Sequence, residues 1–61
     1  MARFVALAAP DLGGDIYVNP DQVRFIQQEG ATPDRSVIEF DDHRRISIAL
    51  SPEAIARRFT D

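Results

Sequence analysis

The chain has 61 residues, a net charge of −3 and a pI near 4.9. This acidity argues against non-specific binding to nucleic acids or anionic membranes, because both depend on an excess of positive charge. The sequence contains no cysteine, which excludes disulfides and thiolate metal sites.

A chain of this length predicts one small domain, which we expect to span residues 1–61. Domains of about 60 residues bury only about 60% of the surface that their unfolded chains expose, so they are marginally stable alone. We therefore expect a homo-oligomer, either a dimer or a larger assembly. No apolar run reaches the roughly 20 residues of a membrane-spanning helix, so we do not expect membrane insertion.

The first expected strand covers residues 3–8, where Val5 and Leu7 share one face. The apolar stretch at residues 4–9 superficially resembles a signal peptide. It is too short for one and runs directly into Pro10. We therefore expect a strand in a cytoplasmic protein.

Residues 10–14, which read PDLGG, have the composition of a turn. The next expected strand covers residues 15–19, with Ile16 and Val18 on one face and Tyr17 on the other. These two strands predict an N-terminal hairpin with its apolar face toward the core.

A turn at residues 19–22 precedes a third expected strand at residues 23–29. Its apolar residues Val23, Phe25 and Ile26 do not alternate regularly. A β-bulge or one turn of helix would bring Val23 and Ile26 to the same side.

After an expected loop at residues 30–35, residues 36–50 predict a β-hairpin. Pairing Phe40 with Ile46 puts the apolar residues of both strands on one face.

The same register pairs Ile38 with Ile48 and sets Glu39 opposite Ser47. It requires a loop of odd length, either residues 42–44 or residues 41–45. A three-residue loop favours a left-handed residue, usually glycine, at its third position. Arg44 would hold that position, so we expect mild strain or the longer loop.

Ser51, Pro52 and Glu53 predict the start of a helix, since they suit its N-cap, its first position and its positive dipole end. Ile55 and Phe59 lie four residues apart and share one face of this helix. We expect this face to dock on the largest apolar surface of the sheet, formed by Ile38, Phe40, Ile46 and Ile48. The predicted fold is α+β: a small antiparallel sheet of four or five strands, a meander of hairpins, with one C-terminal helix packed on one face.

The single histidine, His43, follows Asp41 and Asp42. Such residues can bind a divalent cation or support acid–base chemistry. Three adjacent residues at a hairpin tip do not converge easily, so we expect solvated turn residues. The sequence therefore predicts no catalytic residue, no metal site and no cofactor.

Two basic pairs, Arg44–Arg45 and Arg57–Arg58, could hold a phosphate or an acidic partner if they converged.

The sheet face opposite the helix is the second candidate site. Exposed apolar surface of this kind usually marks an interface. We expect a homo-oligomer or partner contact there, formed by Val37, Ala49, Phe4, Tyr17 and Phe25.

From Thr32 onward, and also in a segment upstream, the sequence resembles the FlbD-like, or SwrD-like, family of small bacterial flagellar proteins. The matching features are Pro33–Asp34, Val37–Ile38, the strand at 46–50, Ser51 with Glu53, and upstream Val18–Asn19 followed by Val23 and Ile26. The chain departs from the family's pattern at the hairpin turn, where residues 42–44 stand in place of a glycine turn. The resemblance implies a link to motility and brings no catalytic residues with it.

Together these features predict a non-enzymatic protein-interaction module, in the form of an adaptor associated with motility. The alternative is a small dimeric RNA- or DNA-binding regulator, because the carbon-storage RNA-binding regulators have a similar order of elements. Those proteins are basic along their RNA-binding strands, whereas this chain is acidic, so nucleic acid is the less favoured partner.

Overall fold

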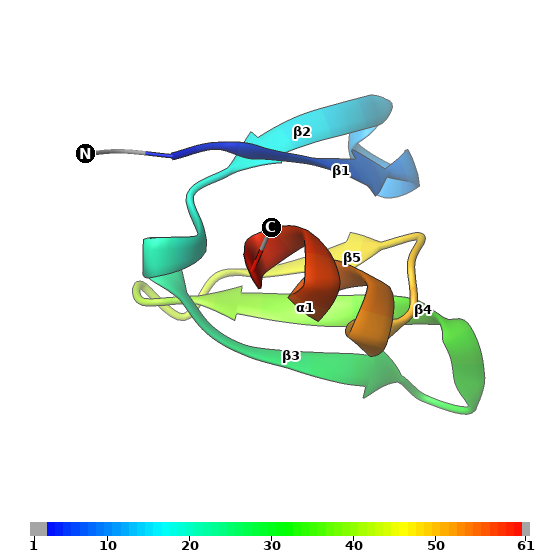
Figure 1. The fold of residues 1–61 in the computed structure, drawn as a ribbon. Coiled ribbons are helices and arrows are strands. Elements are labelled where there is room, and N and C mark those ends of the chain that lie inside the picture. Colours follow the sequence, from blue (N-terminus) through cyan, green and yellow to red (C-terminus); the bar gives the residue numbers. More distant parts are fainter. Residues whose placement is uncertain (1–2, 61) are drawn as a thin grey trace.

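The computed structural model describes residues 3–60. In this part of the chain, five strands, two short 3-10 helices and one α-helix follow one another (Figure 1). In chain order they are β1 (Val5–Ala9), η1 (Pro10–Leu12), β2 (Gly14–Val18), η2 (Pro20–Gln22), β3 (Val23–Glu29), β4 (Thr32–Phe40), β5 (Arg45–Ile48) and α1 (Pro52–Thr60). The predicted α+β class with a C-terminal helix is confirmed. No helix within residues 3–60 has the length and apolar character needed to cross a membrane.

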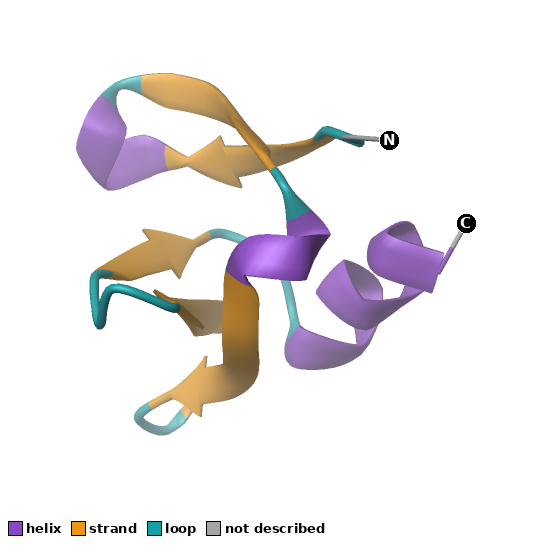
Figure 2. Ribbon diagram, turned by 90° about the vertical axis from the view of Figure 1, so that its left-hand side faces the viewer, coloured by secondary structure: helices purple, strands orange, loops and turns teal. Residues whose placement is uncertain are grey.

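The strands form two antiparallel sheets, β1–β2 and β3–β4–β5, where we expected one. The N–H of Ala49 donates a 3.0 Å hydrogen bond to the carbonyl of Ala8, which places the end of β5 beside β1. Figure 1 shows α1 in front of the three-stranded sheet and below the β1–β2 hairpin, and Figure 2 shows that α1 lies to the side of both. The hairpin and the helix share the inner face of that sheet.

The N-terminal hairpin has the predicted facing. Leu7 pairs with Ile16, and both Leu7 and Val18 are buried. The turn is the 3-10 helix η1, which begins at Pro10 because proline needs no N–H partner at a first helical position. Gly13 closes the turn with a left-handed φ of 87°, a conformation that glycine adopts without steric cost.

Strand β3 has the predicted bounds, and its irregular apolar pattern results from a bulge. The pairing with β4 shifts between Val23 and Phe25, which leaves Arg24 as the extra residue. The bulge returns Ile26 to the inner side, opposite Ile38.

The predicted loop at residues 30–35 is wrong. The turn contains only Gly30 and Ala31, and β4 already begins at Thr32. Residues 33–35 are extra residues of β4 between its first and second pairings with β3. This irregular start allows a strand to contain Pro33, which a regular ladder would exclude.

The predicted register of the 36–50 hairpin is also wrong, by two residues. Ile38 pairs with Ile46, and Glu39 pairs with Arg45. A shift of two residues leaves every side chain on its predicted face, because side chains alternate with a period of two. In the observed register Glu39 lies opposite the cationic side chain of Arg45, whereas the predicted register placed Glu39 opposite Ser47.

The loop of this hairpin has the predicted odd length, but it contains residues 41–43. The N–H of Phe40 donates a 2.9 Å hydrogen bond to the Arg44 carbonyl, which closes the loop one residue earlier than expected. The left-handed third position is therefore held by His43, with a φ of 68°, and not by Arg44. Asp42 favours this arrangement because its carboxylate accepts the Arg44 N–H at 3.1 Å.

The core lies between the two sheets and α1. It is formed by Leu7, Ala9, Val18, Ile38, Ile48 and Ile55. As predicted, Ser51 caps the helix, since its Oγ accepts the N–H of Ala54 at 3.2 Å. Only part of the predicted docking face is covered, because Phe40 and Ile46 remain half-buried.

Candidate functional site

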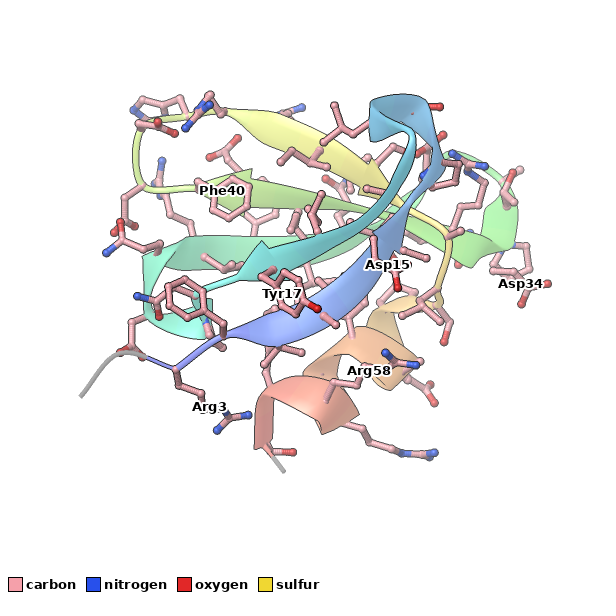
Figure 3. The ribbon with its side chains drawn as sticks, turned by 90° about the horizontal axis from the view of Figure 1, so that it is seen from above. Arg3, Asp15, Tyr17, Asp34, Phe40 and Arg58 are labelled. Carbon is pink, nitrogen blue, oxygen red and sulfur yellow. The ribbon has the colours of Figure 1, made fainter. Side chains whose placement is uncertain are left out.

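An open groove lies between β2 and the turn that connects β4 with β5. It has a volume of about 580 Å³. Figure 3 shows two of its residues from above, Tyr17 on β2 and Phe40 on β4. Its apolar lining also includes Leu12, Ile16 and Ile46. Phe40 and Ile46 belong to the inner face of the sheet that α1 leaves partly open.

The groove runs along the edge of β2. Four consecutive residues, Ile16 to Asn19, line it. Consecutive strand residues point to opposite faces, so they can line one groove together only along the backbone edge. Within the described residues, β1 is the only strand that pairs with β2, so this edge has free backbone groups.

Within residues 3–60, most of the exposed large apolar side chains lie on or beside the N-terminal hairpin. Phe4, Leu12 and Tyr17 are 63%, 60% and 74% exposed, while Phe25 on β3 is 38% exposed. Tyr17 lies opposite Ala6, and Phe4 directly precedes β1. We call Phe4, Leu12 and Tyr17 the hairpin surface. It continues into the groove, because Leu12 and Tyr17 belong to both.

The predicted interface residues do not form one surface. Tyr17 lies on β2 and Phe4 directly precedes β1, whereas Phe25 and Val37 lie on the outer face of the three-stranded sheet. The expectation that Val37 and Ala49 are exposed needs correction, since both are half-buried. The backbone N–H of Ala49 bonds to Ala8 of β1, and Val37 pairs with Gln27 on one side and with Ser47 on the other.

The rim of the groove is acidic. Arg44 forms an ion pair with Asp42, with 3.0 Å between Nε and Oδ2. The N–H of Arg44, followed by its guanidinium, holds the pKa of Asp42 below its ordinary value of 3.8. The carboxylate of Asp41 forms no hydrogen bond or ion pair with any other residue in 3–60. Arg44 is thus occupied by Asp42, and Asp41 is free to meet a cation.

The outer face of the three-stranded sheet has a buried carboxylate that the sequence analysis missed. The side chain of Glu39 is only 7% exposed and forms ion pairs with Arg24 at 3.2 Å and Arg45 at 2.9 Å. The Arg45 guanidinium also lies 5.9 Å from the centre of the Phe25 ring. The two arginines shield Glu39 from solvent, and Arg24 reaches it because the bulge in β3 turns it to this face.

His43 takes part in the same cluster. Its Nδ1 lies 3.1 Å from Arg24 Nη1 and 3.8 Å from Glu39 Oε2. The ring is thus a hydrogen-bond partner of Arg24 at the edge of the turn. No group of three or more His, Cys, Asp or Glu residues among residues 3–60 is placed to hold a metal ion.

Arginines of the two basic pairs bind different partners in different parts of the structure. Arg44 and Arg45 pair with Asp42 and Glu39 at the start of β5. Arg58 donates to the carbonyl of Ala6 at 3.1 Å. Arg3, which the sequence analysis did not single out, donates to the last turn of α1 at the Arg58 carbonyl, 2.8 Å away. Figure 3 shows Arg3 and Arg58 beside α1 and β1, where they hold the helix against the hairpin.

Sequence reasoning identified Tyr17 and Arg44 as site residues but missed the other apolar residues of the groove. The composition of residues 10–14 predicts only a turn, although a leucine between Pro–Asp and Gly–Gly has no local reason to be apolar. Phe40 and Ile46 were assigned to the helix dock. Comparisons with known protein families, curated proteins and solved structures found no match.

Proposed function

We propose that this chain is a non-enzymatic protein-interaction module that binds its partner through the hairpin surface and the groove. The observation that carries the proposal is the position of the exposed apolar side chains. Among residues 3–60, three of the four exposed large apolar side chains lie on or beside the N-terminal hairpin, and two of these also line the groove. Exposed apolar side chains that border a groove with a polar rim are typical of protein–protein contacts.

The composition of the site supports a protein partner. Aromatic residues are enriched at the cores of protein interfaces, and Tyr17 and Phe40 would supply such a centre. The acidic rim at Asp41 and Asp42 repels the phosphates of nucleic acids and attracts basic protein groups. The resemblance to the FlbD-like family, which covers the chain from Thr32 onward and also includes residues upstream, supports a partner associated with motility.

The proposal can be tested by affinity capture from the cytoplasm of the source organism. The chain is immobilised as the wild type, as the double variant Leu12→Ser/Tyr17→Ser, and as Phe25→Ser. The first variant alters the hairpin surface, and the second removes an exposed aromatic residue from the other sheet. Circular dichroism confirms that each variant is folded.

We expect the double variant to retain at least about tenfold less of the captured partner, because truncation of hot-spot side chains at the centre of an interface costs more than about 1.4 kcal/mol. Phe25→Ser should retain it fully. Equal capture by all three chains, or loss with Phe25→Ser alone, would overturn the proposal. If the partner is a second copy, sedimentation should show a mass that rises with concentration for the wild type and Phe25→Ser, but not for the double variant.

A further inference from the structure

We infer that the groove accepts an extended segment of a partner protein, which adds a strand to the free edge of β2 and presents a basic side chain to Asp41. This inference rests on the proposed function and specifies the occupant of the groove. It follows from three observations: the free edge, the shape of the opposite wall and the charge of the rim.

The first observation is that a backbone edge forms one wall of the groove. Residues 16–19 line it consecutively, and only β1 pairs with β2 in residues 3–60. An unpaired edge presents rows of N–H and C=O groups that an extended chain can pair with. A two-stranded hairpin is marginally stable alone, so a third strand would also strengthen it.

The second observation is the apolar opposite wall. Phe40 and Ile46 are half-buried and line the groove across from β2. Alternate side chains of an added strand would point toward these two residues, since side chains alternate along a strand. The occupant is therefore expected to carry apolar residues at every second position. The volume of about 580 Å³ is sufficient for several side chains and falls in the usual range for binding sites.

The third observation is the charge on the rim. Asp41 forms no ion pair within residues 3–60, while the only arginine that lines the groove, Arg44, is paired with Asp42. An arginine or lysine in the occupant would complement Asp41. An acidic residue at the same position of the occupant would be repelled by Asp41. The rim therefore favours extended segments with a basic side chain at that position over segments with an acidic one.

The test uses the whole chain and a blocked eight-residue peptide. The peptide has valine at alternate positions, one arginine near its centre and threonine elsewhere. Its binding is followed by the amide chemical shifts of the protein. A second peptide replaces arginine with glutamate. Two further peptides carry N-methyl groups, one on the valine amides and the other on the intervening amides.

We expect shift changes at residues 16–19 and 41–44, and binding at least about tenfold weaker for the glutamate peptide. Only alternate N–H groups of an added strand point to the edge it joins. One N-methylated peptide should therefore lose binding and the other should keep it. Asp41→Asn should weaken binding of the arginine peptide by about three- to tenfold. Asp34→Asn, the same charge change on the far side of the molecule in Figure 3, should leave binding unchanged.

Several outcomes would overturn the inference: no shift changes at about 2 mM peptide, changes confined to α1, or equal binding of both N-methylated peptides. A further outcome is that both methylated peptides bind while the double variant Leu12→Ser/Tyr17→Ser still abolishes partner capture. That result would overturn strand addition to β2 but would leave the hairpin surface as the interface. If the glutamate peptide bound as tightly as the arginine peptide, Asp41 would have no role in selecting the occupant.

Discussion

The buried hydroxyl of Ser36 donates a 2.7 Å hydrogen bond to the carbonyl of Leu50. This bond joins the middle of β4 to the bend that precedes α1, two positions that lie 14 residues apart. It fixes the point at which the chain leaves the sheet and turns toward the helix.

Ser36→Ala should therefore destabilise the fold, because the Leu50 carbonyl would lose its donor in a buried setting. We expect a loss of about 1–3 kcal/mol in the free energy of unfolding, measured by urea denaturation. Thr60→Ala is the control, since its hydroxyl bonds are exposed and lie within the helix. A loss below about 0.5 kcal/mol for Ser36→Ala would contradict this role.

The turn of the last hairpin should tolerate glycine at position 43. His43 has a φ of 68°, which costs about 1–2 kcal/mol for a residue with a Cβ, while glycine costs about 0.5–1 kcal/mol in unfolded-chain entropy. We expect His43→Gly to stabilise the fold by about 0.5 kcal/mol in urea denaturation.

His43→Val is the matched opposite, because a β-branched side chain is least suited to a left-handed position. It should destabilise the fold by at least about 1 kcal/mol. If valine were tolerated as well as glycine, the turn would not hold its left-handed third residue in solution.

Asp42 should titrate below 3.8 in an NMR pH titration, because the Arg44 N–H and side chain stabilise its charged form. A group whose pKa is lower in the folded state stabilises the fold at pH values above its unfolded pKa. This stabilisation is lost as the pH falls through the folded pKa. The contribution of Asp42 is therefore fully present well above pH 3.8 and is lost progressively as the pH falls through 3.8 and then through the lower folded value.

Arg44→Gln separates the causes of this lowering. The variant keeps the backbone N–H, which is the largest cause, and removes the charge. We expect the pKa of Asp42 to rise only part of the way toward 3.8, and Arg58→Gln to leave it unchanged. A full return to 3.8 in Arg44→Gln would show that the charge, and not the backbone, is dominant.

The sequence was sufficient to predict the facing of most side chains, because alternation determines which residues share a sheet face. Leu7, Val18, Ile38 and Ile48 were assigned correctly on this basis. The same alternation cannot distinguish registers that differ by two residues. The choice between them depended on the bond from Arg44 to Asp42 and on the ion pair of Glu39 with Arg45, which are side-chain interactions that a hydrophobic pattern does not contain.

The groove could not be predicted in the same way. It depends on how far the N-terminal hairpin reaches over the three-stranded sheet, and this placement involves residues distant in sequence, such as Ala8 and Ala49. The expected single sheet would have left Phe40 and Ile46 under the helix. The hairpin position instead leaves them half-buried beside the edge of β2.

The most direct test of the central claim is site-specific photo-cross-linking in the source organism. A photoreactive phenylalanine analogue is placed at Leu12 in one strain and at Phe25 in another, so that each sheet carries one probe. If the hairpin surface and groove bind the partner, the probe at position 12 should cross-link to one specific protein, and the probe at position 25 should not. A specific cross-link from position 25 with none from position 12 would contradict this assignment.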